Sequence, residues 1–184
     1  MNENYLARIF EHNNWANRQI IQVCLTLTDE QLDAEPTSAT YGSIRKTLVH
    51  IVAAQQRYLH HLTLPLEVRR KHVYPDFADG VEVAGSTSEA FLVEEVANST
   101  GAAFLALARG ETNLFQSTQI HTPDGYIVEP WVLMVQVINH ADEHREQIKS
   151  MLTALGITPP EIDGWMYGES VGALVKIAPG SMKP

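Results

Sequence analysis

Apolar residues recur at steps of three and four along four long stretches of the chain, which places them on one face of an α-helix in each stretch. The helices are expected at about residues 3–27, 43–65, 88–110 and 130–156. The first stretch also carries polar positions, Asn13 and Asn17, on its apolar face. The pattern therefore predicts four amphipathic helices that bury one face each.

Residues typical of helix ends stand at most of the predicted boundaries. Ser43 can cap the free backbone N–H groups of the second helix, and Pro65 marks its end. Pro130 suits the first turn of the last helix, because a proline there removes no helical hydrogen bond. Gly156 and the following Pro159-Pro160 end that helix. These boundaries agree with the hydrophobic pattern.

The segments between the helices have turn residues and no strong helical period. Residues 66–85 are expected to form a long loop with some local structure, and 28–36 a short connection. Pro123-Asp124-Gly125 separates 115–121 from 126–128, which predicts a short β-hairpin before the last helix. The tail after 159 is expected to be irregular. Four of its residues are expected to pack back on the helices: Ile162, Trp165, Met166 and Tyr167.

Four helices of this length favour an all-α four-helix bundle, built as a single domain from residues 1–184. The long connection between the second and third helices allows a crossover instead of a simple up-and-down order. The chain has no internal repeat that would suggest another architecture.

Composition narrows the classes of partner and the compartment. The formal net charge of −9 argues against nucleic acid as a partner, since such a chain repels phosphate backbones. No stretch approaches the ~18 apolar residues of a membrane span, and the N-terminus lacks the features of a signal peptide. Cys24 is the single cysteine and is expected to be a buried apolar residue. A cytoplasmic protein that binds neither membrane nor nucleic acid is therefore expected.

His140 and His144 are the most informative polar residues. They lie one turn apart on the apolar face of the last helix and point into the predicted bundle. Burying two unsatisfied imidazoles costs on the order of 1–3 kcal/mol each, and one metal ion would satisfy both. The alternative is a pair of core histidines bonded to side chains or water.

His50, in the middle of the second helix, is the candidate for a third ligand. It lies at the edge of the apolar stripe, so its position also suits an ordinary structural or surface histidine. The other five histidines are expected to be surface residues. The run from His140 to His144 also matches the H-x-x-E-H pattern of inverted zinc proteases, with Glu143 as base, but this short match lacks a clear acidic third ligand.

Three runs together resemble one known family. They are Asn14-Trp15-Ala16-Asn17, the run from Gly42 to Ile51 (G-S-x-x-x-T-L-x-H-I), and the run from His140 to Ile148 (H-x-x-x-H-R-x-Q-I); Asp163 and Tyr167 resemble a late D-x-x-x-Y element. In this order they are similar to the DinB family of damage-inducible-like metalloenzymes. Glu146 departs from the pattern, since the family commonly has glycine there.

The resemblance implies a four-helix bundle with a long crossover, a homodimer, and a metal site formed by His50, His140 and His144. A divalent ion, Zn or Ni, is the cofactor expected for imidazole ligands. The family is related to thiol-dependent S-transferases, including a maleylpyruvate isomerase, that use small thiols such as bacillithiol or mycothiol. A small-molecule substrate, a low-molecular-weight thiol above all, is therefore the implied partner.

The residues leave the reaction open. Thiol activation by the metal is one hypothesis, and metal-dependent hydrolysis with Asp142, Glu143 or Glu146 as base is another. A third is a metal- or ligand-binding stress-response module without turnover. Four side chains are candidates to line a pocket, although each also suits ordinary packing: Trp15, Asn17, Tyr58 and Trp131.

Overall fold

Four long helices, one in each predicted stretch, form the body of the molecule. The computed structural model describes residues 4–71, 87–112, 119–122 and 124–175. Within these ranges the long helices are α1 (Tyr5–Cys24), α3 (Ile44–Thr63), α5 (Thr87–Arg109) and α6 (Pro130–Ala154). The all-α prediction is confirmed, and the helix ends fall within a few residues of the expected positions.

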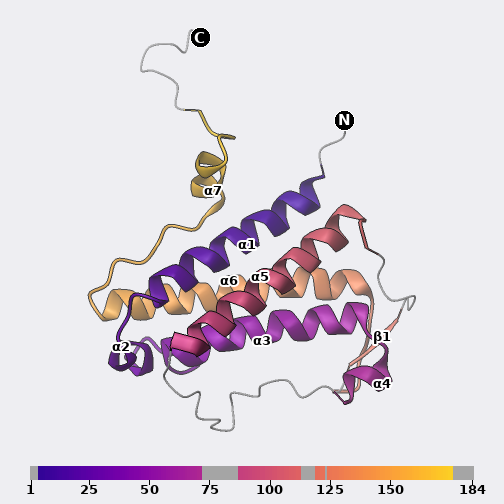
Figure 1. Ribbon diagram of the computed structural model, residues 1–184, viewed down its shortest axis with the longest axis horizontal. Coiled ribbons are helices and arrows are strands. Elements are labelled where there is room, and N and C mark those ends of the chain that lie inside the picture. The colour runs from indigo at the N-terminus through magenta and orange to yellow at the C-terminus, as the bar shows by residue number, and fades with distance from the viewer. Residues whose placement is uncertain (1–3, 72–86, 113–118, 123, 176–184) are drawn as a thin grey trace.

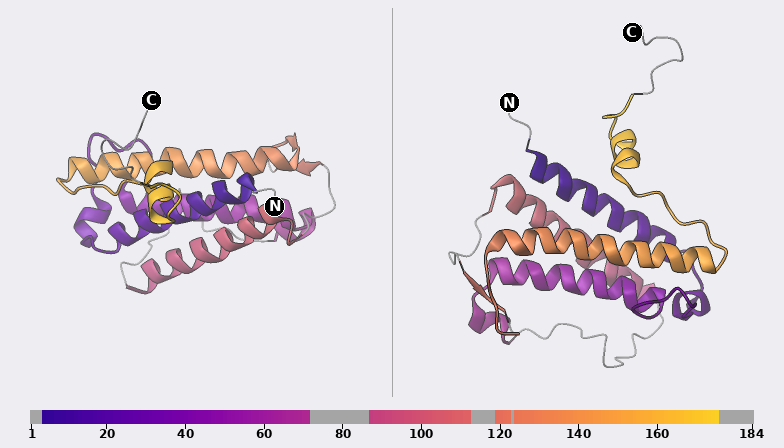
Figure 2. Two further views of the ribbon diagram at one scale, coloured as in Figure 1. Left: turned by 90° about the horizontal axis from the view of Figure 1, so that it is seen from above. Right: turned by 180° about the vertical axis from the view of Figure 1, so that it is seen from behind.

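The four helices form a ring in which α1 contacts α5, α5 contacts α3, α3 contacts α6, and α6 contacts α1. Figure 1 shows α1 and α5 toward the viewer, and the rear view of Figure 2 shows α3 and α6 side by side. The seam between α1 and α5 and the seam between α3 and α6 therefore lie on opposite sides of the bundle.

The direction of α3 and α5 confirms the crossover. Gln55 of α3 bonds to Thr100 of α5, and further along both helices Leu62 packs in one cluster with Phe104. Contacts that advance together along both helices mean that α3 and α5 run parallel. A chain that leaves one helix and starts a parallel neighbour must return along the bundle, which explains why a long segment separates them.

The ends of three long helices carry the residue types that favour them, and side chains cap two of these helices. Asn4 accepts a hydrogen bond from the backbone N–H of Ala7 at the start of α1, and Ser43 accepts one from Lys46 at the start of α3. Pro130 occupies the first turn of α6, where a missing N–H costs nothing. Gly156 follows α6 with a positive φ of 74°, a conformation that glycine adopts without strain.

Two short helices were missed in segments expected to be irregular. The first is α2 (Asp29–Asp33), which begins with a capping box: Thr28 and Gln31 exchange side chain to backbone hydrogen bonds. The T-x-x-Q spacing was present in the sequence and would have predicted this start. The second is α7 (Gly164–Ser170), capped by Asp163, which accepts from the N–H of Met166. The prediction of an irregular tail was wrong for these seven residues.

The predicted hairpin is confirmed in a short form. Strands β1 (Ile120–His121) and β2 (Ile127–Val128) pair antiparallel, with Ile120 opposite Val128. The expected loop after α3 begins with a one-turn helix, α4 (Leu66–Arg69). Residues 72–85 of that loop and 115–118 of the expected strand lie outside the described residues.

The tail packs on α1, as Figure 1 shows for α7. Ile162 is 5% exposed and belongs to the core, and the ring of Tyr167 lies 5.6 Å from the rings of both His12 and Trp15. The prediction for Trp165 was wrong, because its side chain is 69% exposed. The backbone carbonyl of Ile162 lies 2.8 Å from Nε2 of His12, which anchors the segment before α7.

Two large clusters of buried side chains fill the bundle, one at each end. The end near α2 holds Ala16, Ile20, Cys24, Ile44, Ile51, Ala141, Ile148, Met151, Leu152 and Ile162. The end near the hairpin holds Ala7, Phe10, Leu62, Phe104, Ala108, Ile120, Leu133 and Val137. Cys24 is 3% exposed, as predicted, and burial raises the pKa of its thiol to about 12.

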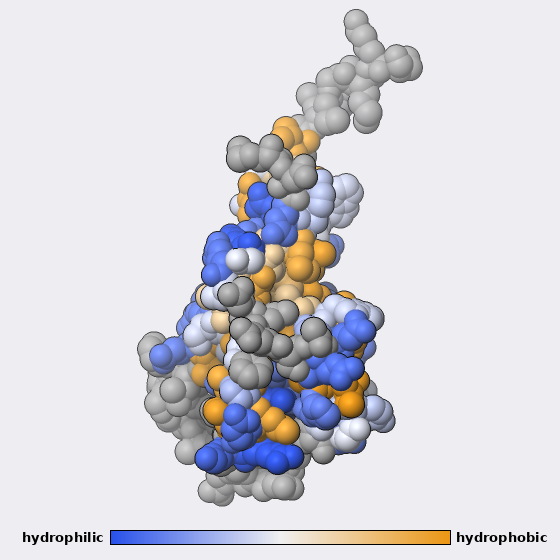
Figure 3. Space-filling model, turned by 90° about the vertical axis from the view of Figure 1, so that its right-hand side faces the viewer, coloured by the Kyte–Doolittle hydropathy of each residue, from blue (hydrophilic) through white to orange (hydrophobic). Residues whose placement is uncertain are grey.

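Some apolar side chains remain on the surface of the hairpin end. Leu6 and Ile9 of α1 are 44% and 47% exposed, and Trp131 at the start of α6 is 62% exposed. Figure 3 shows hydrophobic residues mixed with hydrophilic ones on this side of the molecule. Among the described helices, none is both long enough and apolar enough to cross a bilayer.

Candidate metal centre

Three histidines from two helices meet at the seam between α3 and α6. His50 comes from the middle of α3, and His140 and His144 come from one face of α6. The ring centroids lie 4.8 Å apart for His50 and His140, 4.7 Å for His50 and His144, and 4.5 Å for His140 and His144. One ring nitrogen of each lies within 4.8 Å of those of the other two. The structure thus brings together the three residues that the sequence singled out.

Hydrogen bonds at the far side of two rings orient them. Nδ1 of His144 lies 2.8 Å from Oε1 of Gln147, an oxygen that can only accept, so this nitrogen carries the proton. The Nε2 atom of His144 is then left with a free lone pair. Nδ1 of His50 lies 2.7 Å from the hydroxyl of Tyr41, which fixes the orientation of this ring in the same way.

The environment of His140 keeps its ring neutral. Burial, followed by the nearby charges that His144, His50 and Arg57 can carry, lowers the pKa of His140 to about 4. Its Nε2 lies only 2.9 Å from Nε2 of His50, and the ring of Tyr58 stands edge-on to it at 5.8 Å. A neutral imidazole is the form that binds a metal ion.

The donor set fits one divalent ion. Three imidazole nitrogens face a common point from two helices, and their spread is compatible with a single ion that binds such nitrogens at about 2.0–2.1 Å. The group is partly buried, with His144 only 9% exposed. In the part of the chain that the structure describes, no cysteine or carboxylate joins this group. Zinc, nickel and similar ions match imidazole ligands of this kind.

The acidic residues beside the histidines are engaged elsewhere or point outward. Asp142 is paired with Arg145 at 3.4 Å, and Glu146 is paired with Lys149 at 2.7 Å. Glu143 is exposed on α6. The substitution of Glu146 for the glycine common in the family therefore adds a surface ion pair. None of the three carboxylates belongs to the histidine group.

The candidate pocket residues separate into different regions. Tyr58 borders His140, as described above, whereas Asn17 lies inside the bundle on the α1 side. Trp15 packs against Tyr167 of the tail, and Trp131 is largely exposed. The sequence grouped these residues by type, and the fold assigns Tyr58 alone to the surroundings of the histidines.

Tyr41 and Gln147, which orient the histidines, were missed as site residues. Tyr41 precedes Gly42, whose φ of 137° turns the chain so that the tyrosine ring returns over α3 to 4.2 Å from the ring of His50. No sequence spacing signals this contact. Gln147 stands three residues after His144, a spacing that puts both side chains on one helix face and could have been used.

Arg145 was also missed, and it is the most unusual buried residue of α6, at 1% exposure. Its Nη1 donates to Oδ1 of Asn13 at 2.8 Å and to Oδ1 of Asn17 at 2.7 Å. Asn17 then donates to Gln55, and Gln55 donates to Thr100. Burial lowers the pKa of Arg145, partly offset by Asp142. Ala141 and Ile148 lie on the same face of α6 and indicate that this face is buried. Arg145 was missed because a charged side chain is not expected on a buried face.

The fold and the histidine group fit a metal-binding protein of the helical-bundle class. Comparison with family models gives the same assignment, since the model of the DinB family matches residues 1–174. The chain belongs to the DinB family. A comparison with curated proteins found no match.

Proposed function

We propose that this protein is a metal-dependent enzyme that holds one zinc or nickel ion on His50, His140 and His144 and transfers a small thiol to an electrophile. The observation that carries the proposal is the number of ligands. Three histidines of the described chain meet at the seam, whereas a structural zinc site is usually closed by four protein ligands. A site with three leaves a position for substrate.

The chain's own residues prepare the ligands. Gln147 holds the proton of His144 on Nδ1, and Tyr41 holds the ring of His50, so that the remaining nitrogens converge. A bound divalent ion supplies Lewis-acid chemistry here, because it favours the thiolate, which is the reactive form of a thiol. Tyr41 is 39% exposed, and its ring lies tilted beside that of His50 and edge-on to that of His144, so it stands where a substrate would approach.

The positions of the carboxylates favour thiol transfer over hydrolysis. A hydrolase of this kind uses a base beside the attacking water, and none of the three candidate carboxylates joins the histidine group: Asp142 and Glu146 are held in ion pairs on the surface of α6, and Glu143 is exposed. A thiol depends less on such a base, since its pKa of about 8.5 when free lies far below that of water, and a bound metal ion lowers it further. The family's relation to S-transferases supports the same reaction, with a bacillithiol- or mycothiol-like thiol as substrate.

Metal content of untagged protein tests the first half of the proposal. We expect about one divalent ion per chain in the wild type, and a loss of affinity of about 1000-fold in His144→Ala because one of three ligands is removed. His121→Ala is the matched control, since His121 is an exposed histidine of the hairpin. Absence of bound metal after incubation with zinc or nickel would contradict the proposal.

Turnover tests the second half. The metal-loaded protein is given bacillithiol or mycothiol and a chlorinated dinitrobenzene, and release of chloride is measured as the aryl–sulfur bond replaces the aryl–chlorine bond. We expect release that His144→Ala abolishes and His121→Ala retains. Metal binding without release for any thiol would instead support the non-catalytic binding module. The expected homodimer and cytoplasmic location stay predictions.

A further inference from the structure

An apolar face lies uncovered where α1 and α6 meet at the hairpin end of the bundle. It consists of five large side chains, each between 44% and 72% exposed, and is called the α1–α6 face: Tyr5, Leu6, Ile9, Trp131 and Val135. Leu6 stands four residues before Phe10 and so on the same side of α1, yet Phe10 is 0% exposed and Leu6 is 44% exposed. The side of α1 that is buried further along the helix is therefore bare at its start.

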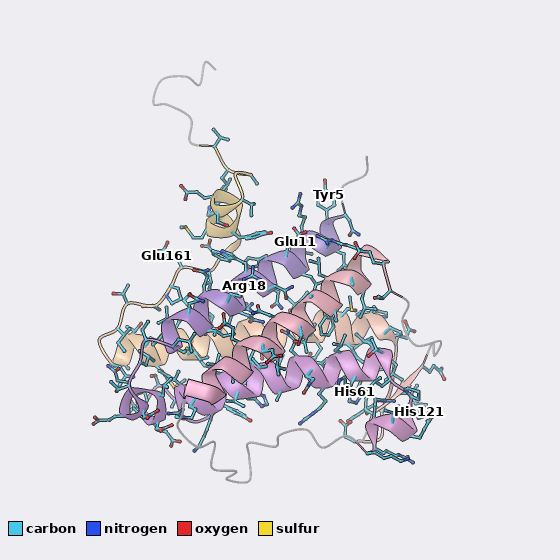
Figure 4. All side chains as sticks on the ribbon, viewed as in Figure 1. Tyr5, Glu11, Arg18, His61, His121 and Glu161 are labelled. Carbon is cyan, nitrogen blue, oxygen red and sulfur yellow. The ribbon has the colours of Figure 1, made fainter. Side chains whose placement is uncertain are left out.

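The five side chains form one continuous surface, because α1 and α6 lie side by side and run in the same direction. Phe10 packs in one cluster with Val137, and further along both helices Ala16 packs in one cluster with Ala141. Members of the face on each helix are spaced by about one turn, and Tyr5 projects outward from the start of α1 (Figure 4). The two exposed rows therefore border one another across the seam.

The tail of the chain covers the rest of this seam. Ile162 packs in the core cluster that joins α1 and α6, and α7 lies on α1 (Figure 2), with Tyr167 against Trp15. Toward the hairpin end, none of the described segments continues this cover, which is why the five side chains stay exposed. An apolar face left bare in this way is typical of an interaction site.

The size of the face fits a second copy of this chain as the partner. At the surface areas typical of such side chains, the exposed parts of the five amount to roughly 500 Å². A standard stable interface buries about 800 Å² on each partner, and in homodimers about 65% of this area is apolar. The α1–α6 face therefore supplies the apolar share that a stable homodimer needs.

The charged and polar groups beside the face are already paired within the chain. Glu11 accepts from Arg8 at 2.9 Å and from Arg109 at 2.8 Å. The indole N–H of Trp131 donates to Glu129 at 2.8 Å, so the ring can be buried without an unsatisfied donor. A face without a dominant charge can pack on an identical face. This matters in a chain with a net charge of −9, since two surfaces of one sign repel each other.

We infer that the α1–α6 face is the interface of a symmetric dimer, in which it packs against the same face of a second copy. The contact joins two α1 helices and two α6 helices about a twofold axis. Tyr5 and Trp131 are its anchors, since large aromatic side chains carry much of the energy of such contacts. On α6, Val135 lies about 180° around the helix from His144, at ~100° for each residue. The dimer therefore leaves the metal centre open, and the inference does not depend on what that centre binds.

Sedimentation equilibrium of metal-free, full-length protein tests this inference. We expect a dimer with a dissociation constant below about 10 µM. Ile9→Glu and Val135→Glu each place an unpaired charge in both halves of the contact, so each should weaken the dimer at least about 100-fold. Leu25→Glu and Val68→Glu are the matched controls, because these side chains lie outside the face and are 44% and 45% exposed. Both controls should dimerise like the wild type, and circular dichroism should show the same helix content in all four variants.

Alkylation of introduced cysteines locates the contact independently. Cys24 is 3% exposed and burial raises the pKa of its thiol to about 12, so an introduced surface cysteine is the reactive one. Val135→Cys should react with N-ethylmaleimide more slowly above the dissociation constant than below it, whereas Leu25→Cys should react at one rate throughout. A wild type that is monomeric at about 100 µM would overturn the inference and leave the face to a different protein. It is also overturned if either glutamate variant in the face dimerises like the wild type, if the two controls weaken the dimer as much, or if Val135→Cys is not protected.

Discussion

Two groups of polar side chains lie inside this bundle, and they are satisfied in different ways. At the seam of α3 and α6, ring nitrogens of His50, His140 and His144 point toward one another. Nε2 of His50 lies only 2.9 Å from Nε2 of His140. Across the interior, Nη1 of Arg145 donates hydrogen bonds to the side-chain oxygens of Asn13 and Asn17, which are acceptors.

This difference distinguishes side chains arranged to bind a ligand from side chains that bond to one another within the core. In the network of Arg145, the side-chain oxygens of Asn13 and Asn17 both meet a donor, although Nε of Arg145 itself has no partner among the described residues. In the histidine group, ring nitrogens face each other. The contact between Nε2 of His50 and Nε2 of His140 can hold only one proton, so at most one of these two nitrogens is a donor there. A cation at the centre satisfies all three lone pairs, which is why this group and not the network is the candidate metal centre.

The largest expected effect on stability comes from the network. Arg145→Met leaves two buried amide oxygens, those of Asn13 and Asn17, without donors, so we expect the free energy of unfolding to fall by about 2–4 kcal/mol. Chemical denaturation of metal-free protein measures it. His50→Ala under the same conditions should cost less than about 1 kcal/mol, because its partners reach solvent. Equal costs for the two variants would remove the distinction drawn above.

A smaller effect is expected from pH in the metal-free protein. The pKa of His140 is lowered from 6.5 to about 4, so the unfolded chain binds more protons than the folded chain between these values. Stability is therefore complete above about pH 6.5 and falls as the pH drops toward 4, by about 1–2 kcal/mol once partial exposure is considered. Denaturation midpoints across this range measure it, and His140→Gln should show a flatter profile. An identical slope in that variant would assign the dependence to other groups.

The smallest effect is expected on metal affinity, from a change at Gln147, the residue that orients His144. Gln147→Leu removes the acceptor for Nδ1 of His144, and metal affinity should fall about tenfold while the fold is retained. Competition with a chelator of known affinity measures the change. Gln147→Glu keeps an acceptor oxygen in place and should retain most of the affinity. Unchanged affinity in the leucine variant would mean that the helix alone positions this ring.

Local patterns in the sequence were enough for the helices and for two of the histidines. A period of three and four residues, together with Ser43, Pro130 and Gly156, predicted the long helices. The same pattern put His140 and His144 on an interior face. Their i, i+4 spacing fixes their separation before any tertiary contact forms, so the pair could be predicted directly from the sequence.

Other features were signalled locally but overlooked. The T-x-x-Q spacing at Thr28 and the cap at Asp163 mark the starts of α2 and α7, both of which the structure contains. The expected burial of Trp165 was wrong for a different reason. A large apolar side chain on a short helix is buried only where a neighbour covers that face, and the helix period does not reveal the neighbour.

The sequence by itself determined the helical bundle and, through resemblance, implied its crossover and the set of three histidines. Only the tertiary structure decided that His50, at the edge of its apolar stripe, meets the other two, and that Tyr41 folds back over it. It also decided that Arg145 is buried among amides and that Asn14 faces Gly101. The physical reason is that each of these contacts joins side chains distant in the sequence or placed by a turn. Their positions depend on how whole helices pack, and a local period carries no information about that packing.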